Sequence, residues 1–244
     1  MAFRLRAFFL HFLVSLVLAG SALAVIFFIW YPSPLHTAIG VSSVVLLLLG
    51  VDVTLGPLLT LLLAKKGKKG LVFDLSFVAF LQISAFIYGF VVVAEGRPVW
   101  LVFNKDRFDI VRAYELQNPY RERASVNYRQ LSFLGPVWVA ARPPADSAAR
   151  YALLTEAVSL GIDLPQRPDL YLPLQDVADQ LKNQVRPLAI LSEFNDHHQV
   201  NEVLARWPEA DGFVPMMAPA RAMTVLINKK SASVIAIVEL NPWH

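Results

Sequence analysis

Three long apolar runs dominate the first 94 residues of the chain. They cover residues 7–31, 38–64 and 71–94, and each is longer than the about 20 apolar residues that a helix needs to cross a ~30 Å hydrocarbon core. Residues 95–244 have the mixed composition of a globular domain. We therefore predict a membrane domain of residues 1–94 with three transmembrane helices, followed by a separate domain of residues 95–244.

The composition of the whole chain agrees with a membrane protein. Hydrophobic residues make up 56% of the sequence and charged residues 17%, whereas soluble domains average roughly 45–50% apolar and about 25% charged residues. The sequence contains no cysteine, which excludes disulfides, thiolate metal sites and a cysteine nucleophile. We expect no cofactor.

The first run allows two interpretations. Arg4 and Arg6 precede an apolar stretch that reaches the small residues Ser21–Ala24, a pattern that a signal peptidase accepts. The run continues without a break to Tyr31, however, and its only clearly polar residues are His11, Ser15 and Ser21. This length exceeds that of a signal peptide, so we predict an uncleaved helix that ends in an interfacial aromatic pair, Trp30 and Tyr31.

Basic residues predict the orientation of the helices. They cluster before the first run and between the second and third runs, at Arg4, Arg6, Lys65, Lys66, Lys68 and Lys69. Loops rich in lysine and arginine stay in the cytoplasm, so the prediction is a cytoplasmic N-terminus, an inner-membrane location and a periplasmic C-terminal domain. The same clustering beside apolar runs argues against nucleic-acid binding.

Asp52 lies near the middle of the second run, where an ionised carboxylate costs about 2.5–3.5 kcal/mol even on lenient insertion scales. If the second and third runs form an antiparallel hairpin about Gly67, residues at equal distances from it share a depth in the membrane. This rule pairs Asp52 with Gln82, and Thr60 with Asp74. We therefore expect Asp52 to hydrogen-bond Gln82, and Asp74 to bond Thr60 or the lysine loop.

Two roles remain open for these intramembrane groups. They either hold the helical hairpin together, or Asp52 faces a partner helix or carries protons, because carboxylates buried in membranes are often functional. Three helices with one central carboxylate offer no proton relay. Gly56 and Pro57 follow Asp52 and predict a kink in the second span.

The C-terminal domain is predicted to be α+β with an antiparallel sheet and helices on one face. Alternating apolar residues favour a hairpin of strands over 98–103 and 108–114, and a second hairpin over 222–228 and 233–240. A helix is expected over 146–160, capped by Asp146 or Ser147 and ended by Gly161. We further expect helices over 175–184 and 196–207, and a strand over 187–191.

No catalytic arrangement is found in this domain, and we predict a protein that is not an enzyme. His198 and Glu202 have the i, i+4 spacing of a helical metal site. They lack a complete ligand set and the H-E-x-x-H pattern, so we interpret them as a solvated helix start and expect no metal.

Several motifs resemble the TfpX/TfpZ (FimB-like) family of type IV pilin accessory proteins. They are Trp30-Tyr31-Pro32-x-Pro34-Leu35, Gly50-Val51-Asp52-Val53-x-Leu55-Gly56-Pro57-Leu58-Leu59-Thr60, Lys69, Asp74-Leu75, Gln82, Tyr88-Gly89, Arg97-Pro98-Val99, Asp106-Arg107-Phe108, Gly135-Pro136 and Arg167-Pro168-x-x-Tyr171-x-Pro173. The similarity covers essentially the whole chain and is strongest over residues 30–112.

The resemblance implies an inner-membrane accessory or chaperone-like protein for one type IV pilin, rather than an enzyme. A pilin waits in the membrane as one apolar helix with a periplasmic head, and a membrane hairpin with a periplasmic domain is suited to touch both parts. Our hypothesis is that Gly50, Asp52, Gly56 and Gly89 contact the pilin helix. The chain itself also has the lipid bilayer as a partner.

The main alternative is a membrane-anchored periplasmic ligand-binding or sensory module. A deep pocket with convergent polar groups in the C-terminal domain would favour it, whereas an exposed apolar groove continuous with the membrane helices would favour a pilin partner. A transporter fits less well, because three spans make a small pathway and the sequence shows no related halves.

Overall fold

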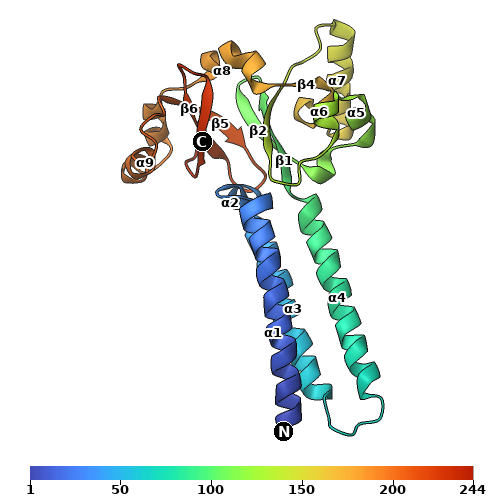
Figure 1. Ribbon diagram of the computed structural model, residues 1–244. Coiled ribbons are helices and arrows are strands. Elements are labelled where there is room, and N and C mark those ends of the chain that lie inside the picture. Colours follow the sequence, from blue (N-terminus) through green and yellow to red (C-terminus); the bar gives the residue numbers. More distant parts are fainter. Residues whose placement is uncertain (244) are drawn as a thin grey trace.

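The computed structural model describes residues 1–243, which form a long helical stalk that carries a globular head (Figure 1). The described part of the chain has three helices that are long and apolar enough to cross a membrane. The stalk helices are α1 (Ala2–Ala24), which continues as a π-helical segment (Val25–Trp30), α3 (Val41–Leu63) and α4 (Leu71–Glu95).

The helix boundaries follow proline and glycine positions. The first helix runs unbroken past the small residues at Ser21–Ala24 and ends at Trp30, shortly before Pro32. The second long helix starts at Val41 rather than at 38, because residues Leu35–Ile39 form a separate short helix, α2, that ends at Gly40. Gly40 has a φ of +77°, a left-handed conformation that favours glycine.

Helix α2 belongs to the head as much as to the stalk. Leu35 and Ala38 are buried in the same apolar cluster as strand residues of the head. The backbone N–H groups of Ala220 and Arg221 donate to the carbonyl oxygen of Ala38, over 2.9 and 3.2 Å. The loop between the first two long helices is therefore fixed against the sheet.

The head is built on one seven-stranded sheet with the order β4-β3-β1-β2-β5-β6-β7. Its strands are β1 (Pro98–Asn104), β2 (Arg107–Arg112), β3 (Val137–Ala141), β4 (Tyr171–Leu172), β5 (Gly212–Met217), β6 (Met223–Asn228) and β7 (Ser233–Val238). The α+β class is confirmed.

The prediction of an antiparallel sheet is wrong, because the sheet is mixed. Strand β1 pairs parallel with β3, and β2 pairs parallel with β5, while the other neighbours are antiparallel. Parallel pairing needs a long crossover between strands. Residues 113–136 and 142–211 supply such connections, which the two sequence-local hairpins did not reveal.

Helices and short turns fill these connections. The helices are α5 (Asn118–Arg123), α6 (Val126–Arg129), α7 (Ser147–Leu160), α8 (Ala178–Gln184) and α9 (His197–Leu204). Single 3₁₀ turns lie at Ala113–Glu115, Leu164–Gln166, Pro168–Leu170, Leu174–Val177 and Leu188–Glu193.

Most of the local predictions for the head are confirmed. Both hairpins form, as β1–β2 and β6–β7. Helix α7 begins after Asp146, whose carboxylate accepts from the Ala149 N–H at 2.7 Å, and it ends at Gly161. The helices expected over 175–184 and 196–207 are shorter, at 178–184 and 197–204.

The strand expected over 187–191 is wrong. Residues 188–193 form a 3₁₀ helix that places Leu191 in a buried cluster with Phe213. A short apolar run has no period long enough to separate a strand from a helical turn.

The prediction of helices on one face of the sheet is wrong, because each face has an apolar core to which a helix contributes. Leu101 and Phe103 of β1 face one core, with Leu181 of α8, whereas Val102 faces the other core, with Leu153 of α7. This alternation is the period of two that a strand imposes on its side chains.

Candidate functional site

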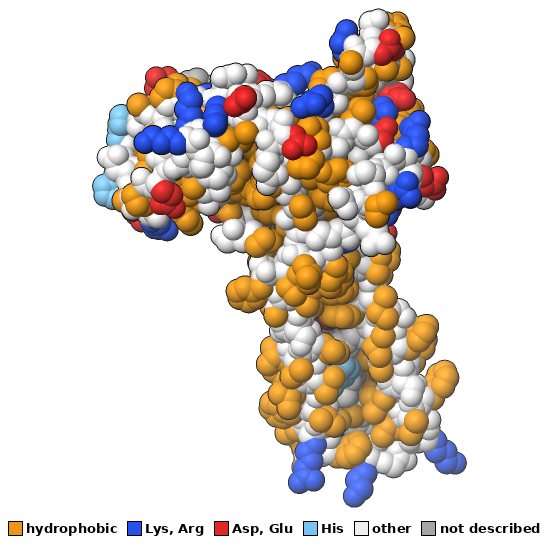
Figure 2. All heavy atoms as spheres, turned by 45° about the horizontal axis from the view of Figure 1, so that its top comes forward, with side chains coloured by type: hydrophobic (Ala, Val, Ile, Leu, Met, Phe, Trp, Pro, Cys, Tyr) orange, Lys and Arg blue, Asp and Glu red, His pale blue; other side chains and the backbone are white. Residues whose placement is uncertain are grey.

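The most unusual feature of the stalk is a group of polar side chains between its apolar helices. Helices α1 and α4 both pack on α3, and a groove runs between them. The group comprises His11 and Ser15 on α1, Asp52 and Thr60 on α3, and Gln82 on α4. Figure 2 shows the stalk hollowed between its helices, with histidine atoms inside the hollow.

Gln82 is the centre of this polar network and joins all three helices. Its Oε1 lies 2.8 Å from the Nε2 of His11. Its Nε2 donates to the Ser15 hydroxyl at 3.0 Å and to the backbone carbonyl of Asp52 at 2.9 Å. The amide thus uses both N–H hydrogens and its oxygen, which is the full inventory of a glutamine apart from one lone pair.

The network also determines which ring nitrogen of a neutral His11 carries the proton. Because the Gln82 Oε1 only accepts, the Nε2 of His11 must donate to it. The Nδ1 is then free to accept the hydroxyl proton of Thr60, which lies 2.6 Å away. Two of the three spanning helices are therefore tied to His11 by directional bonds.

Glycine at position 56 makes room for this arrangement. A Cβ atom built on Gly56 would lie 1.7 Å from the Gln82 Oε1, which no real contact permits. Gly89 on α4, nearer the head, makes room for the Leu48 side chain of α3, because a Cβ atom built on Gly89 would lie 1.7 Å from the Leu48 Cδ1. Gly50, which lies about 1.7 turns before Gly56 on α3, has open space around it. Small residues let membrane helices approach closely.

The expected bond between Asp52 and Gln82 exists, but it uses the backbone of Asp52 and not its carboxyl group. The Asp52 side chain is only 8% exposed, lines the groove, and its Oδ2 atom is buried without a hydrogen-bond partner. A buried polar atom without a partner is costly. Asp52 is thus the one member of the group with an unmet bonding requirement.

The remaining intramembrane predictions are resolved individually. Asp74 forms an ion pair with Lys68 of the lysine loop at 2.5 Å, as one of the two expected alternatives. Thr60 bonds His11 instead of Asp74. Pro57 lies inside α3 and is buried, and it deprives the Val53 carbonyl of its usual helical donor.

The groove itself has a volume of about 510 Å³. Apart from the polar group, its walls are apolar and come from α1 and α4, with residues such as Leu10, Leu18, Ile83 and Phe86. An apolar groove with a polar floor suits a ligand that is itself largely apolar and carries one polar group.

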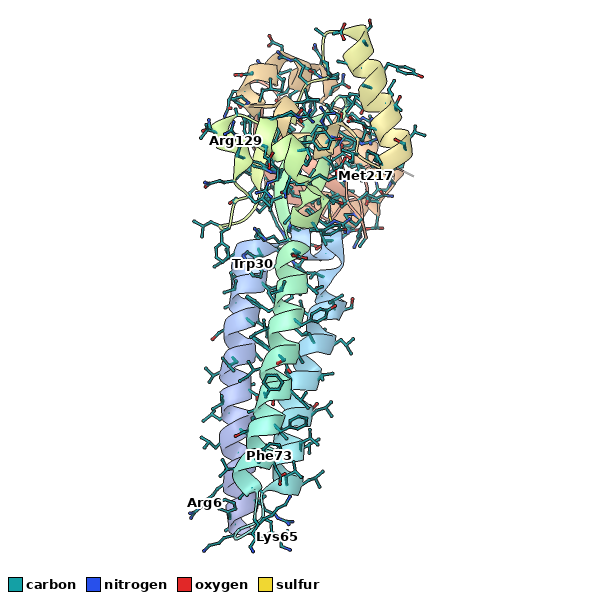
Figure 3. The ribbon with its side chains drawn as sticks, turned by 90° about the vertical axis from the view of Figure 1, so that its right-hand side faces the viewer. Arg6, Trp30, Lys65, Phe73, Arg129 and Met217 are labelled. Atoms are coloured by element: carbon teal, nitrogen blue, oxygen red, sulfur yellow. The ribbon has the colours of Figure 1, made fainter. Side chains whose placement is uncertain are left out.

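The basic residues of the stalk lie at the end away from the head. Figure 3 shows Arg6 and Lys65 at this end and Trp30 at the other, directly under the head. The remaining members of the basic set, Arg4, Lys66, Lys68 and Lys69, belong to the same chain start and the same interhelical loop.

The charged and phenolic side chains of the head form ion pairs and hydrogen bonds between its turns and helices. Arg167 binds Asp169 at 2.9 Å and Glu156 at 2.7 Å, and the hydrogen bonds that its guanidinium donates to Asp169 raise the pKa of Arg167. Burial raises the pKa of Tyr171, whose hydroxyl donates to the Pro165 carbonyl.

The metal site that His198 and Glu202 could have formed is not assembled. Glu202 pairs with Arg206 at 2.7 Å. Within residues 1–243, no group of three or more histidine, aspartate or glutamate side chains is arranged to hold a metal ion.

Sequence reasoning missed the part that His11 and Ser15 play. Both were visible as polar residues in the first span, but their partners lie 49 to 71 residues away in the chain. A symmetric hairpin rule applies to the second and third spans only, and therefore says nothing about the first helix.

The fold and the site define a class: a small membrane protein in which three apolar helices share one polar network and carry an α+β head. The family model for fimbrial assembly protein FimB matches residues 1–40. A fimbrial assembly protein of Dichelobacter nodosus serogroup I is 32% identical over 96% of this chain and 94% of its own length, and one of serogroup E1 is 30% identical over the same shares.

The chain therefore belongs to the FimB family of fimbrial assembly proteins, which confirms the resemblance found in the sequence. A third relative, of serogroups C1 and C2, is 41% identical over 42% of this chain and 79% of its own length. No solved structure matches the chain.

Proposed function

We propose that this protein acts in pilus assembly as an inner-membrane accessory, chaperone-like protein for a cognate type IV pilin. Support comes from relatives along nearly the whole chain that are named fimbrial assembly proteins. In this proposal residues 1–94 are the membrane domain and residues 95–244 the periplasmic domain. The role needs no catalysis.

The proposed orientation rests on the basic residues. All six of them lie in the N-terminal segment and in the loop between α3 and α4, at the stalk end remote from the head. By the positive-inside bias this end faces the cytoplasm. Three crossings then bring the head to the periplasmic side, where pilin heads also lie.

The observation that carries the proposed pilin contact is the groove between α1 and α4. It is open to the side of the stalk, its walls are apolar, and its floor includes Asp52, whose Oδ2 is buried without a hydrogen-bond partner. Lipid tails can fill such walls but cannot hydrogen-bond a carboxyl group. A transmembrane helix that brings a hydrogen-bond donor to this depth satisfies both requirements.

Site-specific photocrosslinking in cells that make the cognate pilin tests this contact. Photoreactive residues replace Leu10 and Ile83, which line opposite walls of the groove. Leu47 on α3 is the matched control, because it is exposed on the stalk and does not line the groove. We expect pilin adducts at 10 and 83 and none at 47.

Adducts of equal strength at all three positions would indicate unspecific contact and contradict the groove. Pull-down of pilin gives a second readout. Asp52→Leu should weaken the recovery of pilin, whereas Thr54→Val should not, since the Thr54 hydroxyl bonds only carbonyl groups of its own helix, those of Gly50 at 2.7 Å and Val51 at 3.5 Å. Wild-type recovery with Asp52→Leu would remove the carboxyl group from the contact.

The alternative, a periplasmic ligand-binding or sensory module, has weaker support in the head. One hollow of the head has a volume of about 420 Å³, and another, between the head and the end of the stalk, has a volume of about 380 Å³. The first is lined by uncharged polar side chains such as Asn127, Gln130 and Gln175 and so meets the criterion of convergent polar groups in part, but no acidic or basic side chain lines either hollow. The groove in the stalk is larger than either of these hollows.

A further inference from the structure

A loop of the head reaches down to the end of the stalk and carries two exposed apolar side chains. It connects α6 to β3, covers residues 130–136, and contains no charged residue. Phe133 is 59% exposed and Leu134 is 83% exposed. A head surrounded only by water gains nothing from such a pair at the tip of an uncharged loop.

The loop lies beside the last turn of the first stalk helix. The Phe133 ring packs edge-on against Trp30, with 5.6 Å between the ring centroids. A Cβ on Gly135 would lie 3.0 Å from the Ile29 carbonyl oxygen, and the φ of Gly135 is +101°. The close approach and the left-handed backbone both favour glycine at this position.

Ile29 and Trp30 belong to the apolar helix of residues 2–30 that is able to cross a membrane. Their neighbour Phe28, one residue before Ile29, is itself 83% exposed on the stalk surface. The tip of the loop therefore lies at the level of residues that face lipid when the helix spans a bilayer.

Aromatic and basic side chains pack together under the loop, where the stalk meets the head. Trp30 and Tyr31 lie at the end of the helix and are only 2% and 1% exposed, so the exposed apolar surface at this level comes from Phe28, Phe133 and Leu134. The Arg97 guanidinium carbon lies 5.9 Å from the Trp30 ring centroid, so its charge is held beside the aromatic ring at the end of α4. Basic side chains near helix ends reach toward the headgroups.

We propose that residues 131–136 insert Phe133 and Leu134 into the bilayer leaflet next to the head. The head is then held to the membrane by this loop as well as by the ends of α1 and α4. The proposal requires that the stalk helices cross a bilayer, and it is independent of any pilin contact.

Because the chain contains no cysteine, single-cysteine variants carry a nitroxide spin label at one chosen site. Leu134→Cys is compared with Phe28→Cys on the stalk and with Tyr151→Cys on α7, where Tyr151 is 73% exposed. The protein is reconstituted in vesicles of phosphatidylethanolamine and phosphatidylglycerol. Oxygen collects in the bilayer core, whereas a water-soluble nickel chelate stays outside.

We expect the ratio of oxygen to nickel accessibility at 134 to approach that at 28 and to exceed that at 151. A ratio at 134 equal to that at 151, with 28 in lipid, overturns the loop insertion alone. A water-like ratio at 28 as well would overturn the membrane assignment of the stalk.

The unmodified chain provides a second measurement that needs no substitution. Lipids with a photoreactive group in the acyl chain should attach to residues 131–136 in wild-type protein, besides the stalk helices. Attachment confined to α1, α3 and α4 would contradict the proposal.

Discussion

Replacing Gln82 by leucine tests the polar network in the stalk most directly. The substitution keeps roughly the same side-chain size and removes three bonds, to His11, Ser15 and the Asp52 carbonyl. Measured interhelical bonds in membranes average about 0.6 kcal/mol each, so the three together contribute about 2 kcal/mol. The apolar leucine side chain adds little to the free energy of unfolding, since lipid is as apolar as leucine.

We therefore expect Gln82→Leu to lower the free energy of unfolding by about 2 kcal/mol, which is roughly a 30-fold change in the unfolding equilibrium. Unfolding of the purified protein in mixed micelles with rising dodecyl sulfate measures this loss. Thr54→Val is the matched control, because the Thr54 hydroxyl bonds only within α3. A loss with Gln82→Leu no larger than that with Thr54→Val would refute the network.

A double-mutant cycle tests which atoms carry the bonds. Because Gln82 bonds the carbonyl and not the carboxyl group of Asp52, Asp52→Asn and Gln82→Leu should be additive. Ser15→Ala and Gln82→Leu should be non-additive, since each substitution removes the same 3.0 Å bond. The opposite pattern would mean that the Asp52 side chain, and not its backbone, is the partner of Gln82.

Three further outcomes are expected. Gly56→Ala should destabilise the stalk at least as much as Gln82→Leu, because the new Cβ atom displaces the Gln82 amide. Gly50→Ala should be neutral or stabilising, because position 50 has open space and alanine favours a helix. Thermal unfolding in detergent compares the stability of the two glycine variants. Tyr171→Phe should cost the head about 1 kcal/mol in chemical denaturation, because it leaves the buried Pro165 carbonyl without its donor. The Asp196 carboxylate caps α9, and hydrogen bonds from Gln199 and His198 hold its pKa below the ordinary value. The stabilisation of the fold by the charged Asp196 carboxylate is complete above the ordinary pKa of an aspartate and is lost as the pH falls through the lowered pKa. Amide hydrogen exchange in α9 should therefore accelerate below about pH 4 in the wild type. The acceleration should be smaller in Asp196→Asn, because asparagine caps the helix without a charge.

The sequence predicted those features that depend on neighbouring residues. The presence of the three long helices, the Asp146 cap, the Gly161 stop and both hairpins follow from local patterns, and the structure confirms them. The parallel pairings of the sheet could not be predicted, because they join strands separated by whole helices. The 3₁₀ helix at 188–193 was mistaken for a strand, since six residues carry too little periodicity.

The candidate site shows the same division. The depth rule for a hairpin placed Gln82 beside Asp52 correctly, because both residues belong to consecutive antiparallel helices. It could not distinguish the backbone of Asp52 from its carboxyl group. Nor could it identify His11 as a partner, because the position and rotation of α1 are set by packing against α3 and not by chain connectivity.

The three stalk helices are connected to the head by contacts at one junction. The short loop between α1 and α3 is anchored at Ala38 by two backbone bonds from the head. Tyr31, at its start, donates its hydroxyl proton to the Val93 carbonyl of α4 at 2.7 Å. All three stalk helices are thus tied to one junction under the sheet. If a partner helix occupies the groove as proposed, this junction is the part of the chain that connects it to the head.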